Sequence, residues 1–279
     1  MDWDGKLYET SHSFVSAYGV DVLDMLGGIS GKTVLDAGCG TGTLAAEAQR
    51  RGARVLGVDA DENMLAIARE NHPGLHFERC RLEEFVRKDA FDAAYSNAVL
   101  HWIADQKKVV ENVYASLKKG GLFACEFGGA GNAQTVLSAL EEGLKCEGLP
   151  LKSPFHYRGE EFARVLEDAG FNVKYMKLFP RMTDMKEGAD GLDNWILQFC
   201  RDTLPEDKGS LARILEYVRG AVRGELFFGG IWHVDYMRLR FLAQKYPCGL
   251  PSAAEYGPRR AISLADGMQN TAADEEKYK

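Results

Sequence analysis

The chain has 279 residues, 46% of them hydrophobic and 27% charged, which are the fractions of an ordinary globular protein. Its formal net charge of −7 does not favour a nucleic-acid partner, because proteins that bind nucleic acids usually present a basic face. No apolar run is long enough to span a bilayer, and the acidic residues 1–5 lack the pattern of a signal peptide. Six scattered cysteines without a CxxC pair indicate reduced thiols, so we expect a cytoplasmic protein.

The first expected element is a helix that precedes every strand and lies within residues 1–30. Ser11 or Ser13 is placed to cap this helix, and Gly27 ends it. An apolar stripe runs along it, formed by Phe14, Val15, Tyr18, Val22, Leu23 and Leu26.

Residues 33–42 hold the motif around which the rest of the chain is organised. The apolar run 33–36 predicts a buried parallel strand, and an Ala-rich helix is expected over 42–51. Between them, glycines stand at three alternate positions. A strand, a glycine turn and a helix form the first unit of a nucleotide-binding α/β sheet, in which glycine lets a ligand lie against the backbone.

The details of this loop favour one kind of ligand over another. The dinucleotide-binding fingerprint has its third glycine three residues after the second, where this chain has Thr43. Asp36, two residues before the first glycine, would repel a pyrophosphate but suits a cationic ligand with a free amine. The segment 34–42, VLDAGCGTG, resembles motif I of the class I S-adenosylmethionine (SAM) methyltransferases.

The second strand is expected over 54–59 and ends in an acid. An acid about twenty residues after the glycine loop, at the tip of this strand, holds ribose hydroxyls in NAD and SAM proteins. Asp59 therefore indicates an adenosine ligand without deciding between the two cofactors. Asp61 is placed to cap the helix expected over 62–71, and a third strand is expected over 75–78.

The remaining elements of the sheet continue the alternation of strand and helix. Asp105 is placed to cap one of these helices, and residues 128–132 lead into another. The expected bounds are 90–96, 122–127 and 171–175 for the strands and 160–169 for one helix, while the helix that Asp105 caps continues through Lys118 and Lys119 until Gly120 breaks it.

The pattern then changes. Residues 181–232 carry no strand signal but hold two helical patterns, around 195–199 and along 211–222, so we interpret them as a helical insertion over the cleft. Residues 234–243 alternate again and predict a last, antiparallel strand. Residues 247–279 lack periodicity and are rich in Pro, Gly, Ala and charge, so we expect a disordered tail there.

A second resemblance narrows the family. The segment 91–103, FDAAYSNAVLHWI, resembles the segment after the fourth strand in the trans-aconitate methyltransferase-like branch of the class I methyltransferases. Three further motifs fit the same branch, at 3–8, 126–132 and 235–241. The resemblance implies a Rossmann-like α/β fold with a seven-stranded sheet, helices on both faces and a helical cap. Residues 1–246 would form one domain, with a lid over 1–30.

The resemblance also implies SAM as the methyl donor and S-adenosylhomocysteine as its product. In the family the glycine loop wraps the methionine part of SAM, and the acid before it, here Asp36, reaches the ammonium group directly or through water. Related sequences carry an acid at the adenine amino group where this chain has Arg81, and the Leu82 N–H or Glu83 can serve instead. The implied cofactor-binding residues are Asp36, Gly38, Cys39, Gly40, Thr41, Asp59, Ala60, Met64, Arg81, Leu82, Asn97 and Trp102.

The implied reaction limits what the acceptor site must do. Methyl transfer from a sulfonium has a neutral leaving group, so the protein's main work is to align donor and acceptor and to exclude water. A base is needed only when the acceptor must lose a proton, and a carboxylate need not. His101 is the candidate base, with packing as its alternative role. The candidate acceptor-binding residues are Tyr8, His12, His101, Trp195 and His233, with Arg158 and Arg181 for an anionic acceptor.

Two other classes of protein remain open from the residues alone. One is an NAD(P) oxidoreductase on a similar sheet, which the glycine spacing and Asp36 disfavour. The other is a SAM-binding protein that acts as a sensor, as a scaffold or by different chemistry, since a sequence shows binding residues but not turnover. We expect a small-molecule acceptor, no metal ion, no nucleic-acid or membrane partner, and a monomer or homodimer.

Overall fold

The computed structural model describes residues 13–185 and 188–246, and these lie within one compact unit. The predicted lid residues Tyr8 and His12 and the predicted tail 247–279 lie outside the described residues. The expectations for them therefore stay predictions.

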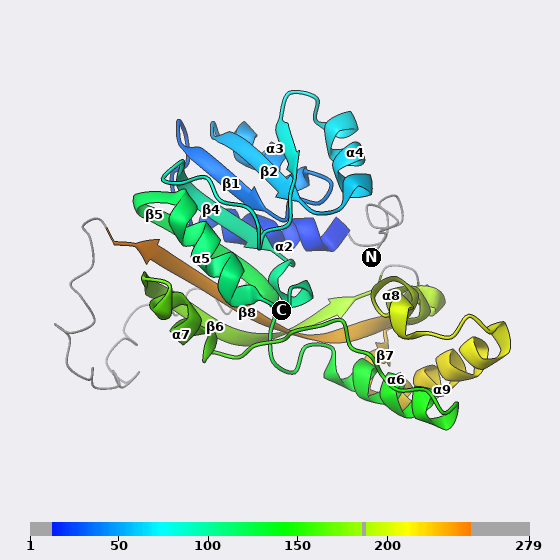
Figure 1. Ribbon diagram of the computed structural model, residues 1–279. Helices are drawn as coiled ribbons and strands as arrows, with labels where there is room; N and C mark the ends of the chain where they lie inside the picture. The colour runs from blue at the N-terminus through cyan, green and yellow to red at the C-terminus, as the bar shows by residue number, and fades with distance from the viewer. Residues whose placement is uncertain (1–12, 186–187, 247–279) are drawn as a thin grey trace, which may run out of the picture. The chain divides into compact units, whose positions relative to one another are not determined.

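A mixed sheet forms the centre of this unit, with strand order β3-β2-β1-β4-β5-β8-β6 and with β7 paired to β8 (Figure 1). The first five strands of the chain are parallel, and β8 is antiparallel to both of its neighbours, β5 and β6. The seven-strand path and the antiparallel last strand confirm the sequence prediction, and the short β7 is an addition. The bounds are β1 Thr33–Ala37, β2 Arg54–Asp59, β3 His76–Arg79, β4 Phe91–Asn97, β5 Leu117–Gly128, β6 Phe171–Asp184, β7 Phe227–Phe228 and β8 Ile231–Lys245.

Helices cover both faces of the sheet, as the sequence predicts. Successive residues of a strand point to opposite faces, so Val34 enters the core under α2 and α3, while Leu35 enters the core under α5 and α7. The bounds of the helices are α2 Ser13–Asp24, α3 Thr43–Arg50, α4 Glu62–Asn71, α5 Gln106–Ser116, α6 Gln134–Cys146, α7 Phe162–Asp168, α8 Gly191–Phe199 and α9 Lys208–Leu226. Three short 3₁₀ turns join them, η1 Leu100–Trp102, η2 Gly188–Asp190 and η3 Arg201–Thr203.

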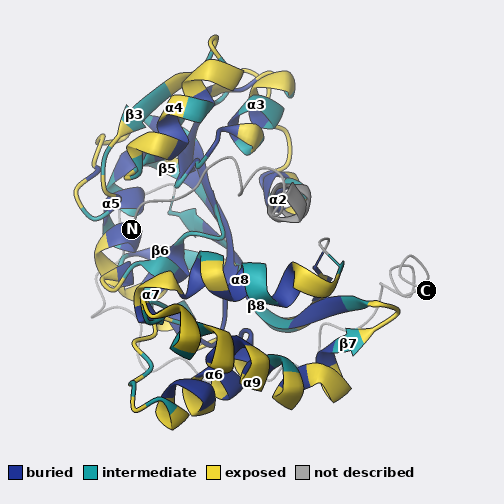
Figure 2. Ribbon diagram, turned by 90° about the vertical axis from the view of Figure 1, so that its right-hand side faces the viewer, coloured by how far each residue is buried: buried dark blue, intermediate teal, exposed yellow. Residues whose placement is uncertain are grey.

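A third hydrophobic core joins α6, α8 and α9 to the start of β8, where Trp232 and Val234 are buried. Gly143 of α6 lets α9 approach closely, since a Cβ at this position would lie 3.2 Å from the ring of Tyr217. In Figure 2 the outward faces of α6 and α9 are exposed, in yellow, whereas the residues of β8 are buried or intermediate, in dark blue and teal. The helices of the predicted insertion are therefore anchored on β8 and on α6.

The predicted bounds of the helical insertion, 181–232, are wrong at both ends. β6 continues to Asp184 and β8 begins at Ile231, so the two strands form a long antiparallel pair. Pro180 obscured the strand in the sequence, but β6 is the edge strand of the sheet, where proline's missing N–H removes no ladder hydrogen bond. The helical segment is therefore confined to residues 188–226.

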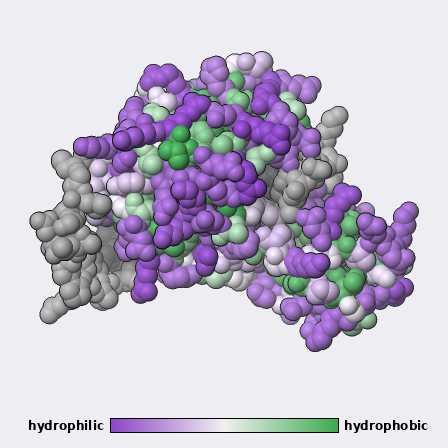
Figure 3. All heavy atoms as spheres, viewed as in Figure 1, coloured by the Kyte–Doolittle hydropathy of each residue, from purple (hydrophilic) through white to green (hydrophobic). Residues whose placement is uncertain are grey.

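Across the described ranges 13–185 and 188–246, none of the helices combines the length and the hydrophobicity needed to cross a bilayer. On the face shown in Figure 3, hydrophilic side chains predominate and hydrophobic ones are scattered between them. Among the described residues, the exposed large hydrophobic side chains are spread over several parts of the chain, and only two of them share an element, β6: Val86, Tyr175, Met182, Leu197, Tyr217 and Phe228.

Candidate functional site

A cavity of about 740 Å³ opens at the carboxyl ends of the strands, where ligands bind in open α/β sheets. Four neighbouring strands reach it at or just after their ends, through Gly38 (β1), Asp59 (β2), Asn97 (β4) and Glu126 (β5). Side chains of α4 and α8, of the loop 154–157 and of the strands β6 and β8 also line it. A cavity of this volume suits small-molecule ligands.

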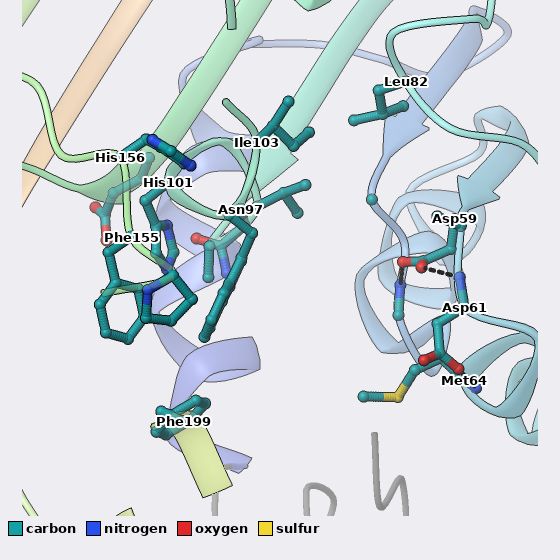
Figure 4. A pocket seen from close by; sticks show the side chains of 18 of the residues that line it. Asp59, Asp61, Met64, Leu82, Asn97, His101, Ile103, Phe155, His156 and Phe199 are labelled. Atoms are coloured by element: carbon teal, nitrogen blue, oxygen red, sulfur yellow. Dashed lines mark hydrogen bonds between the residues drawn. The ribbon is translucent and has the colours of Figure 1, made fainter. Parts of the chain in front are cut away.

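The glycine loop and Asp59 form a polar side of the cavity. The backbone N–H of Gly40 donates to Oδ2 of Asp59 at 2.8 Å, and the N–H of Asp61 donates to Oδ1 at 2.9 Å (Figure 4). Burial raises the pKa of Asp59, although these hydrogen bonds oppose the rise. Gly40 has φ of 52°, and a Cβ there would meet no described atom within 4 Å. The backbone of the loop is therefore open to a ligand.

Asp36 lies next to this loop but does not line the cavity, and its side chain is only 2% exposed. Its Oδ2 has no hydrogen-bond partner among the described residues. Burial raises the pKa of Asp36 to about 7, the nearby Tyr95 hydroxyl acts in the opposite direction, and the charge of Asp59 adds to the rise. An enclosed carboxyl group with an unpaired oxygen is ionised more readily when a positive charge is bound nearby.

Two further residues of the predicted cofactor set do not reach the cavity. Cys39 is held against β2, where its N–H donates to the carbonyl of Val58 at 3.0 Å. Thr41 is buried within the turn, with its Oγ1 3.4 Å from Oγ1 of Thr43. The other nine predicted residues line the cavity, namely Gly38, Gly40, Asp59, Ala60, Met64, Arg81, Leu82, Asn97 and Trp102.

The loop after β3 carries Arg81 where the family pattern has an acid. Arg81 forms an ion pair with Glu83 at 2.6 Å, and both residues line the cavity. Nδ2 of Asn112 in α5 donates to the carbonyl of Leu82 at 2.9 Å, which fixes this loop against the helix. Leu82 and Glu83 are therefore both held at the cavity wall.

Aromatic side chains form the side of the cavity opposite Asp59. Rings from η1 and from the loop 154–157 lie at centroid distances between 4.8 and 6.1 Å, namely those of His101, Trp102, Phe155 and Tyr157. Trp195 and Phe199 of α8 extend this wall. Figure 4 shows His101 and Phe155 on one side and Asp59 on the other. The cavity thus has two sides, a polar one formed by the glycine loop and Asp59 and another lined by aromatic rings.

His101 lies in surroundings that favour the neutral imidazole. The residue is 6% exposed, and its Nδ1 accepts the backbone N–H of Gly128 at 3.3 Å. Burial, and secondly the charge of Arg238, hold the pKa of His101 well below its usual range. A base must take up a proton, which this environment opposes, so the geometry disfavours the predicted base role.

A buried carboxylate at the end of β5 is shared by three guanidinium groups. Arg181 donates to both oxygens of Glu126, at 2.5 and 3.1 Å, while Nε of Arg238 donates at 3.2 Å and Nε of Arg240 at 2.7 Å. Burial opposes ionisation, but the charges of Arg238, Arg181 and Arg240 outweigh it and hold the pKa of Glu126 below its usual range. Glu126, Arg181 and Arg238 all line the cavity.

The sequence-based prediction missed Glu126 and Arg238, although a signal was present. Glu126 is the one charged residue in the apolar run 122–127, and a charge in a buried strand is costly unless it is paired. That cost indicates partners elsewhere in the chain, but not which ones. Of the arginines suggested for an anionic acceptor, Arg181 lines the cavity and Arg158 does not.

Of the predicted acceptor-binding residues that the structure describes, some line the cavity and one does not. His101 and Trp195 line the cavity, whereas His233 does not. Nε2 of His233 lies 3.2 Å from a carboxylate oxygen of Asp184, and its ring stacks on Phe228, so the β6–β8 pairing directs it elsewhere. Among the described residues, no group of three or more His, Cys, Asp or Glu side chains is arranged to hold a metal ion.

The chain is similar to known methyltransferases over most of its length. A family model described as a methyltransferase domain matches residues 35–125. The chain is 30% identical over 262 residues to an uncharacterized methyltransferase of Schizosaccharomyces pombe, with 87% of this chain and 98% of that protein covered. It is 33% identical over 272 residues to the trans-aconitate 2-methyltransferase of Deinococcus radiodurans, with 88% and 99% covered.

The fold agrees with these similarities. A solved S-adenosylmethionine-dependent methyltransferase from Mesorhizobium loti matches with a TM-score of 0.51 at 21% identity, over 82% of this chain and 98% of that one. The cavity therefore belongs to a class I SAM-dependent methyltransferase. Within that family the chain belongs to the branch related to the trans-aconitate methyltransferases. This membership excludes the alternative of an NAD(P) oxidoreductase.

Proposed function

We propose that this methyltransferase transfers the methyl group of SAM to a carboxylate oxygen of a small organic acid. The observation that carries the acceptor class is Arg238, a buried guanidinium group at the wall of the cavity. In this reaction a carboxylate oxygen forms a bond to the methyl carbon while the carbon–sulfur bond breaks and its electron pair stays on sulfur. A methyl ester and neutral S-adenosylhomocysteine result, and no proton moves.

The residues on the polar side of the cavity fit SAM. Asp59 is held at the wall as an acceptor for the ribose hydroxyls, and Leu82 and Glu83 lie where adenine would be bound. Asp36, with its unpaired Oδ2, supplies negative charge for the ammonium group. When bound here, SAM supplies an electrophilic methyl group. The chain's own contribution is to orient the two reactants and to exclude water.

Arg238 is placed to bind an anion. Its Nε is engaged by Glu126, and its two terminal nitrogens make no hydrogen bond to a described residue. Neither nitrogen is among the fully enclosed polar atoms that lack a partner, so both keep accessible surface. Because Arg238 lines the cavity and is 7% exposed, that surface faces the ligand space. A planar guanidinium group with two free nitrogens matches a carboxylate.

The charge of Arg238 supports the same acceptor. A buried cation needs a close anion, and Glu126 is already shared with Arg181 and Arg240. A carboxylate in the cavity would give Arg238 a partner of its own. The name of the Deinococcus radiodurans relative points in the same direction, since trans-aconitate is a carboxylic acid.

The test is a methyl-transfer assay with SAM and a panel of small carboxylic acids that includes trans-aconitate. A phenol and a primary amine of similar size serve as comparison acceptors. We expect S-adenosylhomocysteine and a methyl ester to form only with carboxylic acids. Methylation of the amine or the phenol, with no acid accepted, would contradict the proposed acceptor class.

Two variants connect the assay to the structure. Arg238→Gln should raise KM for the accepted acid roughly 10- to 100-fold, the usual range for a lost hydrogen bond to a charged group. Arg240→Gln is the matched control, because Arg240 binds the same carboxylate but does not line the cavity. It should leave KM near the wild-type value. An equal rise in both variants would show that Arg238 acts only through Glu126.

A further inference from the structure

One nitrogen of the His101 ring accepts a hydrogen bond from the backbone, and the other makes no hydrogen bond to a described residue. Nδ1 accepts the N–H of Gly128, so in the neutral ring the proton resides on Nε2. Nε2 lies on the ring edge opposite Nδ1 and makes no hydrogen bond to a described residue. It is also not one of the fully enclosed polar atoms that lack a partner. It therefore keeps accessible surface, and the ligand cavity is the space that His101 lines.

The ring is held firmly in this orientation. Its faces pack against aromatic side chains, with Tyr157 at a centroid distance of 6.0 Å and Trp102 at 5.2 Å. The N–H of His156 donates to the carbonyl of His101 at 2.7 Å, which ties the loop 154–157 to η1. Gln106, which is buried, strengthens this tie, since its Nε2 donates to the carbonyls of Leu100 and of His156 at 2.9 and 2.7 Å. A donor fixed in this way loses little entropy when it binds.

The neighbouring charges point to the same group on the ligand. Arg238 of β8 is close enough to His101 for its charge to oppose a second proton on the ring. A neutral N–H donor and a guanidinium group at one cavity wall make a pair suited to an oxygen that carries negative charge.

We propose that His101 binds the acceptor as a neutral hydrogen-bond donor, through Nε2–H to a carboxylate oxygen, and does not act as a general base. This inference rests on the proposed carboxylate acceptor, which has no proton to lose at neutral pH. His101 then helps to direct one oxygen of the acid toward the methyl group while Arg238 holds the negative charge.

Two substitutions distinguish this role from its alternatives. The amide nitrogen of His101→Gln can replace the Nε2–H donor. The amide oxygen of His101→Asn can replace the Nδ1 acceptor for Gly128 but leaves no donor at Nε2. We expect kcat/KM for trans-aconitate to fall less than about 10-fold in the Gln variant and roughly 10- to 100-fold in the Asn variant. S-adenosylhomocysteine affinity should stay unchanged in both variants.

The other outcomes overturn the proposal. If both variants lose activity equally and the wild-type rate rises with pH as a group deprotonates, His101 acts as a base. If the Asn variant is active and the Gln variant is not, the contact with Gly128 is the role that matters. If one of the two variants does not fold, the other is compared with the wild type alone. The protonation of the His101 ring in the wild type is then determined directly by NMR.

The ¹⁵N chemical shifts of the His101 imidazole report which ring nitrogen carries the proton. This measurement needs no acceptor. We expect Nε2 to be protonated and Nδ1 not, with no titration between pH 5.5 and 8. The facing groups Glu126 and Tyr157 keep their charge state over this range, since the pKa of Glu126 is lowered and that of Tyr157 is raised. A ring protonated on Nδ1, or one that titrates in this range, contradicts this inference alone. A protein that binds S-adenosylhomocysteine but methylates no carboxylic acid contradicts the proposed function instead.

Discussion

Two single residues at the end of β1 and in the glycine loop, Asp36 and Gly40, differ in how each can affect the binding of one ligand. Gly40 leaves the backbone bare at the cavity, and its N–H also positions Asp59. Asp36 is enclosed and does not line the cavity, so in the proposed function it would contribute charge and not direct contact. Substitutions at Gly40 and Asp36 should therefore differ, because one removes space and the other removes charge.

At Gly40, a valine should abolish the binding of S-adenosylhomocysteine while the protein stays folded. The new side chain would point into the open space of the cavity, and the left-handed φ of 52° adds strain of about 1–3 kcal/mol. Gly120→Val is the matched control, since Gly120 has φ of 79°, open space around its Cβ position and no place in the cavity wall. Calorimetric titration should find binding only in the control. Unchanged affinity in the Gly40 variant would refute the placement of the cofactor.

At Asp36, the prediction concerns pH. The pKa is raised from 3.8 to about 7, so between these values the folded protein holds a proton that the unfolded chain has lost. The free energy of unfolding of the wild type should therefore decrease as pH rises from about 4 to about 7, relative to the uncharged Asp36→Asn. Above pH 7 the difference between the two proteins should level off. Urea unfolding at several pH values measures it, and a constant difference would contradict the raised pKa.

The same titration should appear in ligand binding. A bound ammonium group favours the ionised carboxylate, so S-adenosylhomocysteine should bind the wild type more tightly at pH 8 than at pH 6. In Asp36→Asn the affinity should hardly depend on pH over this range. Calorimetry at both pH values checks this.

At the scale of elements, three strands meet at one carboxylate. β5 contributes Glu126, β6 contributes Arg181, and β8 contributes Arg238 together with Arg240. Arg240 also reaches Asp21 of α2 at 3.2 Å, so the N-terminal helix is joined to the same group. Glu126 is thus linked to β6 and β8 directly, and to α2 through Arg240.

Glu126→Gln should destabilise the fold by about 3–5 kcal/mol, the usual cost of leaving buried charges without their partner. Glu147→Gln is the matched control, because Glu147 also binds an arginine through both oxygens, but at the surface. Its loss should destabilise the fold far less, because solvent screens an ion pair at the surface. Chemical unfolding of both variants measures the difference. An equal decrease in the free energy of unfolding of both variants would show that burial does not determine how much the Glu126 contacts stabilise the fold.

The elements also show what the sequence could and could not predict. The glycine loop, Asp59 and the Asp61 cap are local patterns, and the structure has them where they were expected. The Glu126–Arg238 contact joins residues 112 positions apart, and it depends on the strand register between β5 and β8. No periodicity encodes that register. Pro180 hid the second half of β6 for a related reason, since only the place of a strand in the sheet decides whether proline is tolerated.

At the scale of the whole molecule, the sheet depends on β8, the last of the described strands. β8 lies between β5 and β6, and it adds Leu239, Phe241 and Ala243 to the core under α5 and α7. Without β8, β6 would have no partner in the sheet. All the described elements end by Lys245.

Two shortened chains test this dependence. A chain that ends at residue 246 keeps every described element, so it should unfold cooperatively and bind S-adenosylhomocysteine like the full chain. A chain that ends at residue 180 lacks β8 and should show no cooperative transition. Circular dichroism melting and calorimetry measure both properties. A cooperative, ligand-binding fragment of 180 residues would refute the requirement for β8.

The position of β8 has a consequence for the protein during its synthesis on the ribosome. The parallel strands and the glycine loop emerge first and can begin to pair, but β6 and the second edge of β5 have no partner until β8 has been translated. Glu126 of β5 lacks two of its partners until the same point, because Arg238 and Arg240 lie on β8. Until β8 has emerged, a nascent chain therefore exposes an unpaired edge of β5 and leaves Glu126 without two of its arginine partners. The part of the cavity wall that Arg238 forms is missing before then, so a nascent chain without β8 would lack this side of the ligand site.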